Sequence, residues 1–129
     1  MIEPVSVAVH AVKRTPIAKG DTAAVIGSGM IGLLVVQALK AAGCSKIIAV
    51  DLAEEKLKLA QELGATLGIN PQTTDALQVI REETDGHGAD ITMEVVGATS
   101  TVKTAIEATR KGGSVMLVGN LAPEVNFPL

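Results

Sequence analysis

Three glycines and one aspartate have the residue types and the spacing to bind an anionic nucleotide. Gly27, Gly29 and Gly32 form a G-x-G-x-x-G pattern in the segment AAVIGSGMIGLLVV, between two apolar runs. Asp51 follows a second apolar stretch, IIAV, 19 positions after Gly32. Glycines at this spacing allow a tight turn, a close approach of the backbone to a ligand, and close packing of the following helix. We therefore expect the backbone of this turn to hold a diphosphate.

The elements around these residues predict an α/β fold that places them at one edge of a sheet. Apolar runs predict strands over residues 22–26, 46–50, 66–69, 91–96 and 114–118. Apolar residues at helical spacing predict helices from Glu3-Pro4 to about Arg14, and over 30–42, 54–63, 75–83 and 101–110. This alternation predicts a Rossmann-type open parallel sheet of about five strands with helices on both faces. Ligands of such sheets bind beyond the carboxyl ends of the strands.

Asp51 indicates which dinucleotide the turn would hold. A carboxylate at the end of the second strand can accept hydrogen bonds from both hydroxyls of an adenosine ribose. The extra phosphate of NADP carries roughly −1.5 to −2 charges and would be repelled by this carboxylate. Leu52, the next residue, provides no compensating cation. The sequence therefore predicts NAD as the cofactor; the alternative is that Asp51 caps the helix that begins near Glu54, and the two roles are compatible.

Composition excludes several other functions. The chain has 129 residues, the size of one domain, and a formal net charge of −3 with both signs interspersed. Phe127 is its only aromatic residue; nucleic-acid binders normally show a basic face and stacking aromatics, so no nucleic-acid partner is expected. No apolar run is long enough to cross a bilayer and the start resembles no signal peptide, which predicts a cytoplasmic protein with no membrane partner. The single Cys44 excludes an internal disulfide and a cysteine-cluster zinc site.

Several segments, taken in order, resemble the medium-chain, zinc-dependent alcohol dehydrogenase superfamily. They are EPVSVAVHAV, GDTAAVIGSGMIGLLVVQALKAAG, IIAVDLAEEKLKLAQELGAT, INP, GADITMEVVG and RKGGSVMLVG. The resemblance covers essentially the whole chain and is closest to the sorbitol (polyol) dehydrogenase-like branch. It implies an enzyme that uses NAD to oxidise a secondary alcohol such as a polyol or sugar alcohol. Its partners would be NAD(H) and the small alcohol, and the parent protein would be a homo-oligomer.

The same resemblance assigns cofactor-binding roles residue by residue. The diphosphate turn would comprise Gly27, Ser28, Gly29, Met30, Ile31 and Gly32. Asp51 and Leu52 would lie at the adenosine ribose with Lys56 beside them, although Lys56 equally fits an ordinary surface lysine.

Further along the chain, Val96 and Gly97 would line the adenine side and the floor of the cleft. Val118 and Gly119 would meet the nicotinamide. For these apolar positions the alternative is plain core packing. The pattern EPxxVxxHA also places Glu3 beside the catalytic zinc of the full-length enzyme, whereas an acidic residue near a helix N-terminus is favourable in any case. No catalytic residue is assigned within the chain.

The resemblance also implies parts that this chain does not supply. Members of the superfamily carry an N-terminal domain with the zinc ligands and most of the alcohol pocket, and a sixth strand in the sheet. Residues 1–129 are thus expected to form the NAD-binding domain, with 1–18 a leader helix from the inter-domain junction. Hydride transfer needs alcohol, zinc and nicotinamide held together, so the isolated chain is expected to bind NAD without turnover. Zinc is expected in the full-length parent and not in this fragment.

Two alternatives share the glycine turn. A stand-alone NAD-sensing regulatory module would also use Asp51, but it has no reason to keep the EPxxVxxHA leader. A zinc-free quinone reductase of the same superfamily usually prefers NADP and lacks the acidic residue after the second strand, so Asp51 disfavours it.

Overall fold

The structure is a computed structural model, and it describes residues 4–27 and 29–118. Helices and strands alternate along this part of the chain. The first half comprises α1 (Pro4–Lys13), β1 (Thr22–Ile26), α2 (Met30–Ala42), β2 (Lys46–Val50) and α3 (Glu54–Leu63). The second half comprises β3 (Leu67–Ile69), α4 (Ala76–Glu82), β4 (Ala89–Glu94), α5 (Thr99–Ala108) and β5 (Thr109–Leu117).

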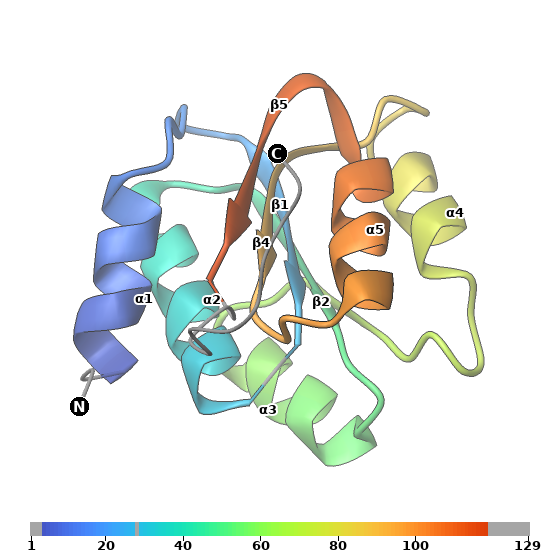
Figure 1. The fold of residues 1–129 in the computed structure, drawn as a ribbon, viewed down its shortest axis with the longest axis horizontal. Coiled ribbons are helices and arrows are strands. Elements are labelled where there is room, and N and C mark those ends of the chain that lie inside the picture. Colours follow the sequence, from blue (N-terminus) through green and yellow to red (C-terminus); the bar gives the residue numbers. More distant parts are fainter. Residues whose placement is uncertain (1–3, 28, 119–129) are drawn as a thin grey trace.

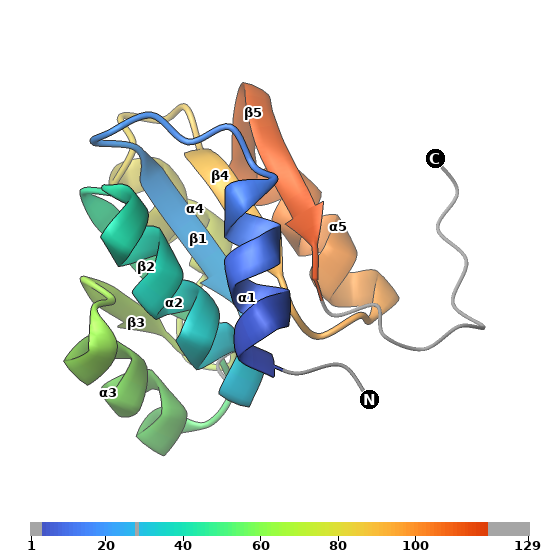
Figure 2. The same ribbon diagram turned by 90° about the vertical axis from the view of Figure 1, so that its left-hand side faces the viewer.

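The five strands form one parallel sheet in the order β3-β2-β1-β4-β5 (Figures 1 and 2). Helices α1, α2 and α3 cover one face, and α4 and α5 cover the other (Figure 2). This confirms the predicted Rossmann-type architecture. The chain moves outward from β1 to β2 and β3, then returns to place β4 on the other side of β1. The strand order therefore reverses between β1 and β4, and ligands of open parallel sheets bind at that point.

The strands are apolar on both sides because both faces of the sheet are covered. In β1, Ala23 and Val25 pack toward α1 and α2, while Ala24 and Ile26 pack toward α4 and α5. All four are buried. Two hydrophobic cores result, one on each side of the sheet, and together they fix the register of the central strands.

The five strands end on a single row across the sheet. In the pairing registers, Ile69 of β3 lies opposite Val50, Val50 opposite Ile26, Ile26 opposite Glu94, and Glu94 opposite Leu117. The turns that follow the strands therefore emerge side by side along one edge, the lower one in Figure 1.

Two predicted boundaries around the last helix are wrong. Strand β4 ends at Glu94 rather than Val96, because the Glu94 side chain accepts hydrogen bonds from the amides of Val96 and Gly97 and so holds them out of the sheet pairing. Helix α5 ends at Ala108 rather than at residue 110, and Thr109 already pairs with Ala89 in the sheet. Residues 110–113 bulge out before Ser114 pairs with Ile91, which is why glycines occur there.

Asp90 connects three strands at the opposite edge of the sheet. Its Oδ2 accepts the Thr22 amide at 2.8 Å, and its Oδ1 accepts Nε of Arg110 at 2.6 Å. Burial alone would raise the pKa of Asp90, but the Thr22 hydrogen bond and the Arg110 guanidinium outweigh it and hold this pKa below its ordinary value. The carboxylate thus stabilises the starts of β1, β4 and β5 together.

We predict that Asp90→Asn lowers the free energy of unfolding by about 1 kcal/mol at neutral pH, because Asn cannot replace both bonds and the charge. A carboxyl with a lowered pKa stabilises the fold above its unfolded-state pKa and loses that effect as pH falls through its folded-state value. The difference between variant and wild type should therefore be constant above about pH 5 and shrink at more acidic pH. Urea denaturation across pH measures it. The matched control is Asp85→Asn in an exposed loop; an equal loss in both variants would contradict the prediction.

Candidate functional site

Gly27 turns the chain out of β1 in a conformation that favours glycine. Its φ is +101°, and its N–H donates to the Val50 carbonyl at 2.7 Å, extending the sheet past the end of β1. A Cβ on Gly27 would lie 2.8 Å from Cγ2 of both Val95 and Val96. The turn is therefore packed directly against the loop that follows β4, across the point where the strand order reverses.

The other two glycines of the motif have different surroundings. A Cβ on Gly32 would lie 2.9 Å from the Gly27 carbonyl carbon and well inside contact with its oxygen, so only glycine lets α2 approach the turn this closely. Among the described residues, a Cβ on Gly29 would meet nothing within 4 Å. Gly29 is the N-cap of α2 and supplies no side-chain cap. Within the described part of the chain, the space beside Gly29 at the N-terminus of α2 is thus open, and the backbone amides and the dipole of a helix N-terminus favour an anion.

Asp51 follows β2 and lies on the same edge. Its N–H donates to the Ile69 carbonyl at 3.1 Å, and its Oδ1 accepts the Ala53 amide at 2.8 Å. Ala53 is the N-cap of α3 and makes no side-chain cap itself. This hydrogen bond shapes the turn before α3 and does not cap the helix, because Ala53 and not a residue of α3 donates it. A carboxylate has enough lone pairs to accept ligand hydroxyls in addition.

Asp51 and the glycine turn share one hollow of about 180 Å³. Its lining residues are Ile26, Gly27, Val50, Asp51, Leu52, Pro71, Val96 and Thr101. Leu52 and Val96 are 59% and 51% exposed, so these two lining residues are not part of the core. A mostly apolar hollow with one carboxylate at its rim can sandwich a flat aromatic base and bind the hydroxyls attached to it.

The remaining predicted residues lie along this edge with different degrees of exposure. In the first turn of α2, Met30 is exposed and Ile31 is half-buried. Lys56 is exposed in α3 and lies outside the lining of the hollow. Gly97 follows β4 with a φ of +87°. Val118 follows β5, and its side chain is buried in the core that faces α1 and α2, which is the packing alternative.

Three predicted residues, Glu3, Ser28 and Gly119, lie outside the described residues. Within residues 4–27 and 29–118, no three His, Cys, Asp or Glu side chains come together to form a possible metal site, so no zinc chemistry is derived from them. The two histidines, His10 and His87, are both exposed. In the same part of the chain, no helix is both long and apolar enough to cross a membrane.

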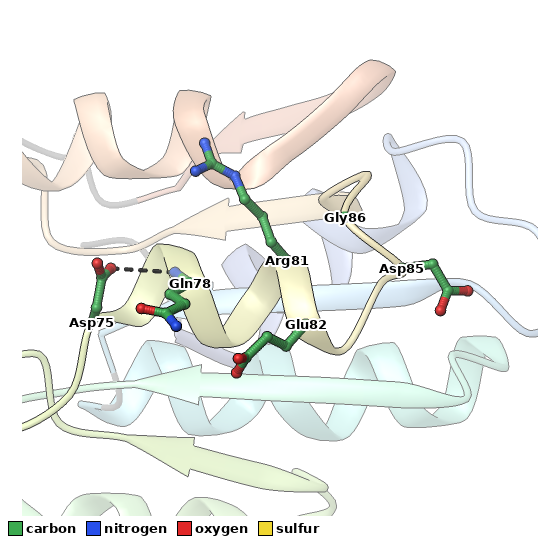
Figure 3. Close-up of a pocket in the computed structure, with 6 residues that line it drawn as sticks. All are labelled: Asp75, Gln78, Arg81, Glu82, Asp85 and Gly86. Carbon is green, nitrogen blue, oxygen red and sulfur yellow. Dashed lines mark hydrogen bonds between the residues drawn. The ribbon is translucent and has the colours of Figure 1, made fainter.

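A larger hollow, about 560 Å³, lies along α4 and the loop after it. Its side chains diverge: Arg81, Glu82 and Asp85 point in three different directions (Figure 3). The one hydrogen bond drawn there, from the Gln78 amide to Asp75, caps α4. Because its polar groups do not converge on a common point, we assign the site to the smaller hollow at the carboxyl edge.

Sequence reasoning missed several residues of this edge. Ile26 and Val50 were assigned to the strands alone, although as the last strand residues they reach the hollow. Pro71 comes from the turn after β3 and Thr101 from the first turn of α5. Glu94 was missed entirely, although an acidic residue inside the apolar segment ITMEVV was a visible signal.

An open parallel sheet with a glycine turn at its point of reversal defines a class of α/β folds common among dinucleotide-binding proteins. Within that class the chain belongs to the zinc-binding dehydrogenase family, whose family model matches residues 31–129. It is 40% identical to the sorbitol dehydrogenase of Bacillus subtilis over 129 residues, which are 100% of this chain and 36% of that protein. It is 42% identical to the (R,R)-butanediol dehydrogenase of the same organism over 92% of this chain and 34% of that protein.

A solved structure from Sinorhizobium meliloti 1021, bound to NADP, has the same fold. The TM-score is 0.89 at 32% identity, and the match covers 98% of this chain and 38% of the other. The chain therefore spans a little over one third of the proteins it matches.

The contrast between two glycines of the turn gives a stability test. We predict that Gly32→Ala lowers the free energy of unfolding by about 2–3 kcal/mol, because its methyl group collides with the Gly27 backbone. Gly29→Ala, the matched control, places the same methyl group in open space at a negative φ and should cost less than about 1 kcal/mol. Chemical denaturation of both variants measures the difference. Equal losses would show that α2 does not pack against the turn as described.

Proposed function

We propose that this chain is the NAD-binding part of a zinc-dependent dehydrogenase that oxidises a secondary alcohol such as a polyol or sugar alcohol. One observation supports this most strongly: the glycine turn and the carboxylate of Asp51 lie on one edge of the sheet, and Gly27 and Asp51 line the same hollow. A turn that leads into a helix N-terminus, next to an acceptor for hydroxyls, suits the adenosine diphosphate half of NAD.

The residues of this edge would divide the cofactor between them. The amides at the start of α2 would hold the diphosphate, and Asp51 would accept hydrogen bonds from the adenosine ribose. Ile26, Val50 and Val96 would pack against the adenine. The nicotinamide, which accepts a hydride when it is bound, would then extend toward the ends of β4 and β5, near Val118 and Gly119.

The alcohol is proposed from the relatives rather than from this chain. Sorbitol dehydrogenase and (R,R)-butanediol dehydrogenase are both named for compounds with more than one hydroxyl group. Since the chain matches only about a third of each relative, the zinc ligands and the alcohol pocket are proposed to belong to the part of the parent protein that lies outside the match.

The charges around Asp51 support NAD over NADP. Glu54 and Glu55 occupy the first turn of α3, directly after Asp51 and Leu52. The Glu54 carboxylate accepts a hydrogen bond from Nδ2 of Asn70 at 2.8 Å, and the same Nδ2 donates to the carbonyl of Leu52, a residue that lines the hollow, at 3.3 Å. A ribose phosphate beside Asp51 would meet its carboxylate, with Glu54 and Glu55 close by in sequence and Lys56 as the nearest cation in sequence. A relative of this chain has been solved with NADP bound, so the preference for NAD over NADP calls for a direct test.

We predict that NADH binds at least about tenfold more tightly than NADPH, and that Asp51→Asn narrows this ratio because it removes the repelling charge. The chain has no Trp and no Tyr, so the fluorescence of either nucleotide can be titrated against a nearly dark protein. Asp85→Asn, in an exposed loop, is the control for the loss of one carboxylate. Equal affinity of the wild type for both nucleotides would refute the proposed NAD preference.

We also predict that the 129-residue chain, supplied with zinc, NAD and sorbitol, produces no NADH. Hydride transfer needs the alcohol carbon and the nicotinamide held together in a fixed geometry. Absorbance at the NADH band measures turnover, and the parent protein or a sorbitol dehydrogenase is the positive control. Sustained NADH formation by the chain alone would show that it contains a complete active site.

A further inference from the structure

Glu94 is a fully buried carboxylate at the centre of the candidate edge. It is the last residue of β4, and its relative exposure is 0%. In the row of strand ends it lies opposite Ile26 of β1 and Leu117 of β5, both apolar. An uncompensated carboxylate in such a position would be strongly destabilising, so its partners have to explain its presence.

Those partners are the amides of the loop that follows it. Oε2 accepts the Val96 amide at 3.0 Å. The Gly97 amide donates to both oxygens, at 3.0 Å to Oε1 and 2.9 Å to Oε2. The side chain thus extends past the end of its own strand and binds the loop that follows. Hydrogen bonds of this kind to a charged acceptor are stronger than those between neutral groups.

The backbone around Glu94 holds the same loop to both neighbouring strands. The Val95 amide donates to the Ile26 carbonyl at 3.0 Å, and the Val118 amide donates to the Glu94 carbonyl at 2.8 Å. Gly97, the last residue of this loop, has a positive φ of 87°. The path of residues 95–97 is therefore determined by Glu94 on one side and by β1 and β5 on the others.

This loop forms one wall of the candidate nucleotide site. Val96 lines the hollow that contains Asp51, and its side chain is half exposed there. Cγ2 atoms of Val95 and Val96 also occupy the space beside Gly27 that a side chain at that position would fill. A shift of the loop would move both the wall of the hollow and the support of the glycine turn.

We propose that Glu94 is a positioning residue for nucleotide binding: its carboxylate holds the Val95–Gly97 loop in the conformation that shapes the hollow. The inference rests on the proposed function for the identity of the ligand. Glutamine has nearly the same shape but only one accepting atom, so Glu94→Gln leaves an NH₂ group facing amide donors. The loop should then move or loosen while the sheet, which has its own backbone hydrogen bonds, stays folded.

The test is a titration of the 129-residue chain with NADH, followed by fluorescence, well below the unfolding temperature of every variant. Glu94→Gln should weaken NADH binding about tenfold or more, because buried donors lose their acceptor. Amide hydrogen exchange supplies a second readout: Val96 and Gly97 should exchange much faster in Glu94→Gln, whereas the Gly27 amide, bonded to Val50, should keep its protection.

The matched control is Thr92→Val, two residues earlier on the same face of β4. Thr92 is also fully buried, and its hydroxyl pairs with that of Thr109 at 2.8 Å, away from the loop. Thr92→Val should destabilise the fold while leaving the NADH dissociation constant unchanged. If Glu94→Gln does not fold, Glu94→Asp, which keeps the charge but shortens its reach, should show the same weakening in a folded protein.

The outcomes separate the two proposals. Wild type that binds NADH, with an unchanged dissociation constant in folded Glu94→Gln or Glu94→Asp, overturns the role of Glu94 and leaves the proposed function intact. An equal loss of affinity in Thr92→Val overturns it as well, since the effect would follow stability alone. Wild type that fails to bind NADH overturns the proposed function and this inference with it.

Discussion

The alignment of five strand ends on one row is the constraint on which the candidate site depends. Ile69, Val50, Ile26, Glu94 and Leu117 are paired across the sheet, so each following turn starts at the same height. Backbone hydrogen bonds continue one residue beyond this row, from Gly27 to Val50 and from Asp51 to Ile69. The turn, the carboxylate and the loop after β4 are therefore positioned by sheet register, which two buried cores hold in place.

At that edge, the three glycines of the motif determine how closely the turn, α2 and the loop after β4 can pack. Gly32 is required because α2 touches the Gly27 backbone, and Gly27 because Val95 and Val96 fill the adjacent volume. Gly29 is different, since nothing in the described chain occupies the space that its side chain would take. Packing thus requires glycine at two positions of the motif, and at the third the described residues leave the space of a side chain open. In the proposed function, that third glycine would let the diphosphate approach the backbone.

The sequence predicted the helices and strands well where their apolar residues followed one clear pattern. The spans of β1, α2, β2 and α3 match their predicted ranges, because the strands are short continuous apolar runs and the apolar residues of the helices recur at helical spacing. The end of β4 was misjudged because Val95 and Val96 extend its apolar run. The strand stops at Glu94 because the Val96 amide bonds to the Glu94 carboxylate, and the apolar pattern of the sequence does not encode this hydrogen bond. Pro71 and Thr101 come to the hollow through tertiary packing, which local periodicity does not encode.

Two carboxylates at this edge differ in what they can bind, and burial is the reason. Asp51 is half-buried and lines the hollow, and its Oδ1 accepts the Ala53 amide. Glu94 is fully buried, and amides of its own loop supply the hydrogen bonds that its charge requires. The Glu94 carboxylate is therefore bound within the protein, whereas the Asp51 carboxylate lines a hollow that a ligand can enter. In the proposed function, Asp51 would accept hydrogen bonds from the ribose directly, and Glu94 would act only through the loop that it holds.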